Sequence, residues 1–124
     1  MSHIYAIDHV QIAMPAGQEE QARDFYRNVL GFMEIPKPAA LAGRGGVWFE
    51  AEGARLHLGV EADFRPARKA HPAFLVDNLA VMIERCRENQ VQMMTDEPLE
   101  GYTRIHIFDP FGNRIELMER IKPK

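Results

Sequence analysis

The stretch YTRIHIFDPFGNRIELME, residues 102–119, decides the fold. It contains two runs in which apolar and polar side chains alternate, at 102–108 and 114–119, and alternation with a period of two is typical of β-strands. Between the runs, residues 109–113 are Asp-Pro-Phe-Gly-Asn, a cluster rich in residues that favour turns. The stretch therefore predicts a β-hairpin.

The alternation also predicts which side chains share a face of this hairpin. In the second run, Ile115 and Leu117 form an apolar face and leave Glu116 on the opposite one. In the first run, Arg104 and His106 fall on the same face as Glu116. They could orient Glu116, bind an anionic substrate or form surface ion pairs, and the sequence leaves these three roles open.

Outward from the hairpin, the chain shows the same order of elements twice: strand, helix, strand, strand, strand. The predicted elements are strands at 6–14, 33–35, 47–51, 55–60, 70–76, 91–94, 102–108 and 114–119, helices at 18–30 and 79–89, and a flexible loop at 39–46. This order predicts an α+β fold of two βαβββ modules, with a curved mixed sheet inside and helices outside. We expect one domain over 1–124, with module one at about 5–61, a linker at 62–69 and module two at about 70–119.

Four potential metal ligands follow the repeat. His9 and His57 are 48 positions apart, and His71 and Glu116 are 45 apart, so each pair opens and closes one half of the chain. A fold that brings these ends together would gather three imidazoles and one carboxylate, a donor set suited to one divalent transition metal. Zn²⁺, Fe²⁺, Ni²⁺, Co²⁺ and Mn²⁺ all suit these donors, whereas Mg²⁺ and Ca²⁺ prefer more oxygen ligands.

The composition argues against several classes of partner and location. The 124 residues carry a net charge of −3, 46% are hydrophobic, and no Lys/Arg run exceeds two residues, which argues against nucleic acid or a membrane as a partner. No apolar run is long enough to span a bilayer, and the N-terminus lacks a signal-peptide core. The single cysteine, Cys86, excludes an intrachain disulfide and fits a reducing cytoplasm, where we expect the protein to be.

Three motifs give the chain its resemblance to a known family: IDHV at 7–10, FYRNVLGF at 25–32 and DPFGNRIEL at 109–117. With these motifs the chain resembles the vicinal oxygen chelate superfamily, which includes glyoxalase I, fosfomycin-resistance enzymes, extradiol dioxygenases and bleomycin-resistance proteins. The resemblance implies paired βαβββ modules around a metal-binding cup, often with two chains per functional unit. We therefore expect a homodimer, whose site could lie within one chain or across two.

Carried over by position, the resemblance implies that His9, His71 and Glu116 are metal ligands. The fourth position, a Glu in glyoxalase I, is His57 in this sequence. His57 fits a fourth ligand in a glyoxalase-type isomerase or lyase, and a proton shuttle in an extradiol-type dioxygenase. In the isomerase branch Glu116 would move a proton, so Glu116 and His57 are the candidate catalytic residues.

The expected activity is that of a metal-dependent enzyme acting on a small oxygenated substrate chelated by the metal. The alternative is a small-molecule (drug) binding and sequestering protein of the bleomycin-resistance type. Trp48, placed by alternation on the cup side, could form a pocket wall for the substrate or could simply pack. Trp48, Arg104 and His106 are the candidate substrate-binding residues.

Overall fold

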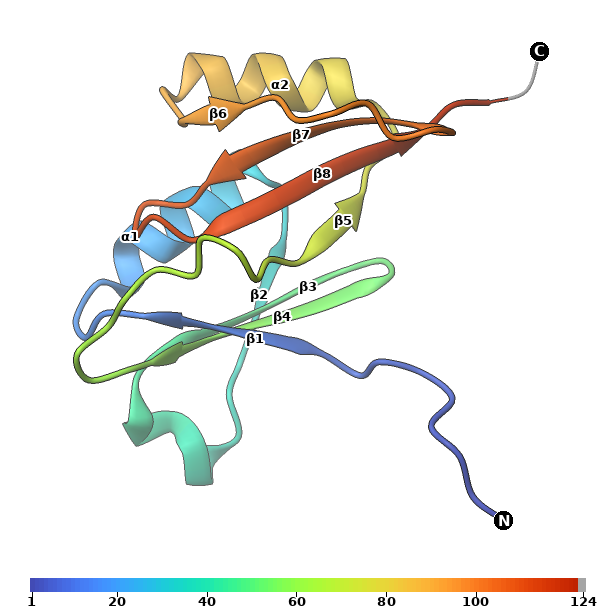
Figure 1. The fold of residues 1–124 in the computed structure, drawn as a ribbon. Coiled ribbons are helices and arrows are strands. Elements are labelled where there is room, and N and C mark those ends of the chain that lie inside the picture. Colours follow the sequence, from blue (N-terminus) through green and yellow to red (C-terminus); the bar gives the residue numbers. More distant parts are fainter. Residues whose placement is uncertain (123–124) are drawn as a thin grey trace.

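The computed structural model describes residues 1–122 and contains two modules with the same order of elements (Figure 1). Module one contains β1 (Val10–Met14), α1 (Glu19–Arg23), a π-helical turn (Asp24–Val29), β2 (Met33–Ile35), a 3-10 helix (Ala39–Arg44), β3 (Val47–Ala51) and β4 (Ala54–Val60). Module two contains β5 (Ala73–Leu75), α2 (Leu79–Glu88), β6 (Met93–Met94), β7 (Tyr102–Phe108) and β8 (Arg114–Arg120). The predicted α+β fold of paired βαβββ modules is confirmed.

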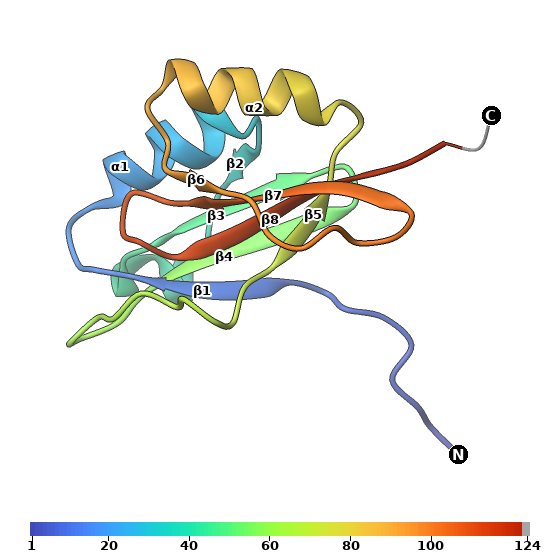
Figure 2. The same ribbon diagram turned by 45° about the horizontal axis from the view of Figure 1, so that its top comes forward.

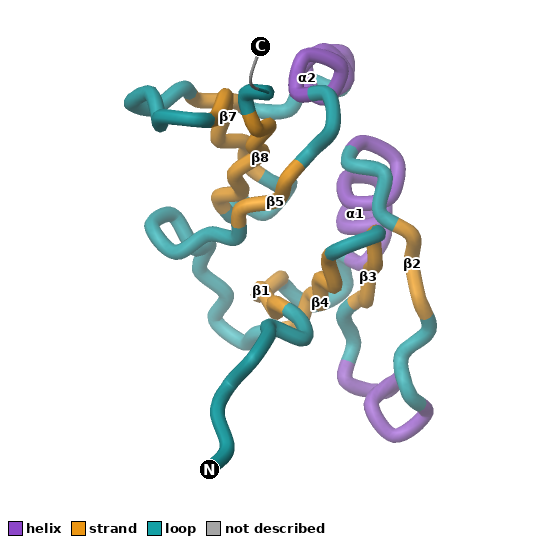
Figure 3. The backbone as a smooth tube through the Cα atoms, turned by 90° about the vertical axis from the view of Figure 1, so that its right-hand side faces the viewer, coloured by secondary structure: helices purple, strands orange, loops and turns teal. Residues whose placement is uncertain are grey.

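Each module forms its own four-stranded mixed sheet. The strand orders are β1-β4-β3-β2 and β5-β8-β7-β6, and in each sheet the first pair is parallel while the other two pairs are antiparallel. Figure 2 shows α1 and α2 side by side, and Figure 3 shows the two sheets meeting at an angle with both helices on the same side. No helix in the described part of the chain is long and apolar enough to cross a membrane.

One hydrophobic core lies beneath both modules. From module one it takes Val47, Phe49, Leu56 and Leu58 among others, and from module two Ile105, Ile107, Ile115 and Leu117. The alternation predicted for the hairpin is therefore confirmed, because the apolar face of β7 and β8 packs into the core. The polar face of each sheet points away from this shared core.

A buried polar network joins the modules at the β7–β8 turn. The Tyr26 hydroxyl donates to Asp109 Oδ2 at 2.6 Å, and Asn113 Nδ2 donates to the Ala13 carbonyl of β1 at 2.8 Å. Asp109 also accepts from the backbone N–H groups of Phe111 and Asn113, at 2.9 and 2.8 Å. The turn motif thus ties β8 to module one.

Several element boundaries differ from those that the sequence predicts. β1 begins at Val10 rather than residue 6, and its pairing with the parallel strand β4 begins there, with Val10 opposite Leu56. β5 begins at Ala73 rather than residue 70. Both His9 and His71 therefore lie just before a strand rather than inside it.

The predicted flexible loop at 39–46 is instead an ordered 3-10 helix. Its end is fixed where Glu19 Oε2 accepts from the Gly46 N–H at 2.9 Å and Lys37 donates to the Gly45 carbonyl. Gly46 has φ +89°, and a Cβ there would lie 2.1 Å from the Leu58 carbonyl oxygen, so only glycine fits. The predicted helix at 18–30 also changes to a π-helical turn after Arg23, which places Phe25, Tyr26 and Val29 in the core.

Candidate metal centre

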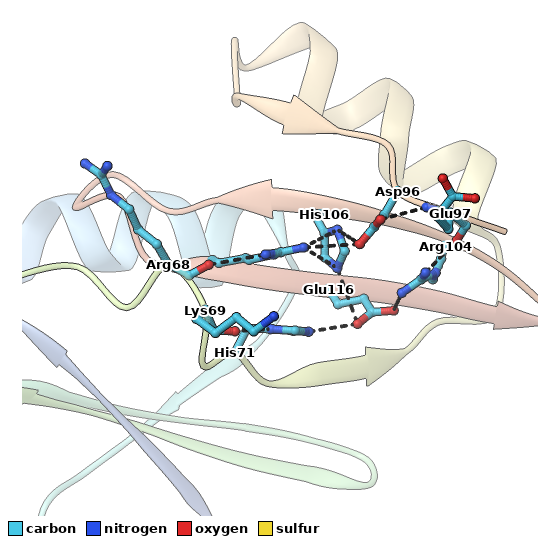
Figure 4. A network of polar contacts seen from close by, with 9 residues as sticks. Arg68, Lys69, His71, Asp96, Glu97, Arg104, His106 and Glu116 are labelled. Atoms are coloured by element: carbon cyan, nitrogen blue, oxygen red, sulfur yellow. Dashed lines mark hydrogen bonds and ion pairs between the residues drawn. The ribbon is translucent and has the colours of Figure 1, made fainter. Parts of the chain in front are cut away.

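Glu116 lies at the centre of a polar cluster on the outer face of module two (Figure 4). Its Oε1 lies 2.9 Å from His71 Nε2 and 3.5 Å from His106 Nε2, and its Oε2 accepts from Arg104 Nη1 at 3.2 Å. Glu116 is only 5% exposed, and three partners surround its carboxylate. Within the described residues, His71, His106 and Glu116 are the one group of three or more His, Cys, Asp or Glu close enough to hold a metal ion.

Strand pairing places these groups together. β7 and β8 pair His106 with Glu116, and β5 and β8 pair Ala73 with Glu116, so the chain leading into β5 carries His71 to the carboxylate. A hydrogen bond from the Glu116 N–H to the Pro72 carbonyl, at 3.0 Å, fixes that approach. The site is therefore built on β7, β8 and the segment that leads into β5.

His71 is oriented so that its Nε2 faces Glu116. His71 Nδ1 lies 2.8 Å from the Lys69 carbonyl oxygen, which can only accept, so Nδ1 carries the hydrogen. In the neutral imidazole, Nε2 then carries a lone pair and no hydrogen. This nitrogen lies 2.9 Å from the carboxylate oxygen Oε1 of Glu116. Two acceptors that close repel unless a proton or a metal ion lies between them. An N–H to carbonyl bond on the far nitrogen is also the usual arrangement of metal-binding histidines.

A second cluster lies on the outer face of module one. The His57 ring stacks on Trp48 at a centroid distance of 3.8 Å and on His9 at 4.2 Å, forming a row of three rings. His9 Nδ1 lies 3.0 Å from Asp8 Oδ2, and Asp8 also pairs with Arg55 at 3.3 Å. His9 thus repeats the arrangement of His71: an oxygen contacts Nδ1, which leaves the lone pair of Nε2 available to a metal ion.

The structure therefore divides the four predicted ligands into two pairs. It brings His71 to Glu116 and His9 to His57, but the group around Glu116 contains neither His9 nor His57. It adds His106 instead, which the sequence offered as a substrate-binding residue. Arg104 lies against Glu116, and Trp48 lies beside His57.

Two residues of the cluster received no role from the sequence. Arg114 Nη2 lies 3.0 Å from His106 Nδ1 and 3.4 Å from Asp96 Oδ2. Arg114 shares the face of Glu116 by strand alternation, so its position could have been predicted. Asp96 lies in the loop before β7, where no periodic pattern constrains a side chain.

The surroundings shift the pKa of three groups in these clusters. Burial works to raise the pKa of Glu116, but the side-chain contact with His71 and the hydrogen bond from Arg104 outweigh it, so the pKa lies below its usual value. Burial lowers the pKa of His57, with the charge of His9 adding to the effect. Burial and the neighbouring Arg114 lower the pKa of His106. Near neutral pH these groups offer a carboxylate and two uncharged imidazoles.

The lowered pKa values predict a loss of stability in mild acid. Below about pH 6.5 the unfolded chain protonates His57 and His106 while the folded chain resists, so the unfolded state binds more protons. The free energy of unfolding should therefore fall as pH drops from about 6.5 through the lower folded-state pKa values. Urea unfolding between about pH 8 and 5 measures this.

The His57→Gln variant should show a flatter dependence than wild type, and His3→Gln, which changes an exposed histidine, should not. Parallel curves for wild type and His57→Gln would contradict the assignment.

A fold of paired βαβββ modules with a His/His/Glu cluster is typical of one class of protein, and comparison with known sequences identifies that class. The chain belongs to the Glyoxalase/Bleomycin resistance protein/Dioxygenase superfamily, whose family model matches residues 6–117. Members of this superfamily typically use a metal, and the His71, His106 and Glu116 group could hold one. The predicted family resemblance is confirmed.

Individual relatives place the chain within this superfamily. A Bacillus anthracis protein described as a member of the glyoxalase family is 43% identical, covers 98% of this chain and 99% of its own, and has a TM-score of 0.92. Glyoxylase I 4 of Arabidopsis thaliana is 25% identical over 93% of this chain and 71% of its own length.

A fosfomycin resistance protein, FosX of Listeria monocytogenes, superimposes with a TM-score of 0.76 at 17% identity, covering 96% of each chain. The antibiotic binding protein TnmS3 of Streptomyces sp. CB03234 superimposes with a TM-score of 0.69 at 21% identity, covering 96% of this chain and 100% of its own. These two likenesses concern the fold alone.

Proposed function

We propose that the protein is a metal-dependent enzyme that acts on a small oxygenated substrate. The observation that carries the proposal is the approach of His71 Nε2 to Glu116 Oε1, with Nδ1–H held by the Lys69 carbonyl. Two donor atoms 2.9 Å apart suit one ion bound at about 2.1 Å from each. The ion is a divalent transition metal, for which Zn²⁺, Fe²⁺, Ni²⁺, Co²⁺ and Mn²⁺ are all suitable.

We infer that His9 of a second copy completes this centre, with its His57 in or next to the coordination sphere. The polar faces of the two modules both point away from the shared core, so a single chain keeps the pairs apart. The N-terminal residues extend from the body (Figure 1) and carry exposed apolar side chains, with Ile4 93%, Tyr5 92% and Ile7 81% exposed. Exposed apolar side chains of this kind mark a surface that binds another protein chain. A two-fold dimer that places module one of each copy beside module two of the other gives two identical centres.

In this centre each residue has a separate task. When bound, the metal supplies positive charge that binds adjacent substrate oxygens and stabilises negative charge developing on them. Arg104 holds Glu116 Oε2 and directs Oε1 toward His71. Glu116 or the largely buried His57 moves the proton, as in a glyoxalase-type isomerase or lyase for Glu116, or an extradiol-type dioxygenase for His57.

Mixing two defective variants tests the metal site and its location together. His9→Ala lies in module one and Glu116→Gln in module two, so each homodimer has two broken sites. A mixed dimer has one intact site, and random pairing then restores about a quarter of the wild-type metal content. The measurement is elemental analysis of co-expressed protein purified without chelator.

A matched mixture provides the control. His71→Gln and Glu116→Gln both lie in module two, so no pairing of these chains yields an intact site and the metal content should stay low. Equal failure of both mixtures would place the site within one chain. Variants that retain wild-type metal content would overturn the metal proposal itself.

Two assays separate the branches of the chemistry. Oxygen uptake with catechols that depends on Fe²⁺ would identify a dioxygenase, and isomerisation of thiol adducts with Ni²⁺, Co²⁺ or Zn²⁺ would identify the glyoxalase type. One neighbour in fold is named an antibiotic binding protein, so sequestration is the competing function. Tight ligand binding that needs no metal and survives His57→Ala would establish it.

A further inference from the structure

A pocket of about 240 Å³ lies on module one beside the row of stacked rings. Its lining residues come from β1, β3, β4 and the segment between β2 and β3: Gln11, Lys37, Leu41, Arg44, Gly45, Trp48, Leu58, Gly59 and Val60. The volume is below that of a typical drug-sized site and suits a small ligand of one ring.

The charged side chains that line the pocket are all positive. Lys37 and Arg44 are both cations, and no acidic side chain lines the pocket. Lys37 bonds to the uncharged Gly45 carbonyl, and Arg44 forms no hydrogen bond or ion pair with any residue in 1–122. The nearby Glu19 carboxylate accepts from the Gly46 N–H at 2.9 Å and is not part of the lining. It offsets one positive charge at most, so the two cations of the lining still favour a negatively charged ligand.

The remaining lining favours a flat ligand. Trp48 contributes an indole wall, held in place because its ring stacks almost parallel on His57, with 2° between the planes. Leu41 adds apolar surface, and Gln11 offers an amide that can donate or accept. The segment that carries Arg44 is anchored at Gly45 and Gly46, so the guanidinium projects from a fixed 3-10 helix.

We propose that this pocket binds a small aromatic carboxylate, with the ring against Trp48 and the carboxylate at Arg44 and Lys37. A guanidinium and a carboxylate form strong charge-assisted hydrogen bonds, and indole presents a flat apolar face. The ring row Trp48–His57–His9 connects the pocket to the metal ligand His9. That the pocket holds part of the substrate rests on the proposed function, whereas the binding itself needs no metal.

The single tryptophan makes the test direct, because Trp48 is the only source of indole fluorescence in the chain. Metal-free protein is titrated with benzoate and with benzamide, its uncharged counterpart, by Trp48 emission and by calorimetry. We expect saturable binding of benzoate at least about tenfold tighter than that of benzamide. Arg44→Gln should weaken benzoate binding about tenfold, and Arg44→Lys should recover part of it.

Arg87→Gln, at an exposed site on α2, serves as the matched control and should bind benzoate like wild type. Equal affinities for the two probes, or no benzoate binding by either method, would overturn the proposal, as would wild-type binding by Arg44→Gln. The metal content of Arg44→Gln should stay that of wild type, so failure of this pocket and failure of the metal centre are distinguishable.

Discussion

Replacing Glu116 with glutamine is expected to lower the affinity for a divalent metal at least about a hundredfold. The change removes the one carboxylate that faces His71 Nε2 at 2.9 Å, and with it the negative charge that offsets the ion. An amide oxygen is a far weaker ligand for Zn²⁺ or Fe²⁺ than a carboxylate. Competition titration with a chromogenic chelator measures the affinity, and activity should fall in parallel.

His106→Gln separates the ligands of this centre from their neighbours. If His106 only contacts Glu116, this variant should lose about 10- to 100-fold in affinity, as is usual for residues that orient a ligand, and less than Glu116→Gln loses. His3→Gln removes an exposed histidine and should leave the affinity unchanged. Wild-type affinity in Glu116→Gln would show that the carboxylate is not a ligand, whatever the behaviour of His106.

Replacing Asp109 with alanine is expected to destabilise the fold by about 3–5 kcal/mol. The side chain is 5% exposed and accepts hydrogen bonds from Tyr26, Phe111 and Asn113. Alanine would leave these buried donors without partners and would open a small cavity. For a chain of this length the loss corresponds to a Tm lower by at least about 10 °C, which calorimetry measures.

Tyr26→Phe provides the graded comparison, because it removes one donor and leaves no acceptor without a partner. It should cost about 1 kcal/mol. A Tm for Asp109→Ala within the scatter of wild type would mean that the network adds nothing to the joining of the modules.

The sequence predicted the fold because its periodic stretches are governed by local rules. Alternation at 102–119 predicted the hairpin and the face shared by His106 and Glu116, and strand pairing places these two residues opposite each other. The 3-10 helix and the π-helical turn were missed, since the first depends on distant partners such as Glu19 and the second on core packing around Tyr26.

The candidate site was predictable only within each module. Equal spacing in a duplicated chain identifies equivalent positions, so it related His9 to His71. It carries no information on whether the two polar faces meet, which depends on how both sheets pack on one core. The spacing also could not predict that the Lys69 carbonyl fixes the His71 ring, because every residue has a backbone carbonyl and the sequence does not show which one accepts a given hydrogen bond.

The network of Tyr26, Asp109 and Asn113 separates what holds this chain together from what it acts on. None of these three residues belongs to the cluster around Glu116, to the ring row or to the pocket beside Trp48. Substitutions on the polar faces can therefore change which ligand is bound while the contacts that join the two modules stay the same. The turn motif is thus informative about ancestry and does not reveal the chemistry. Residues on the polar faces can change to accept a new substrate without altering the fold.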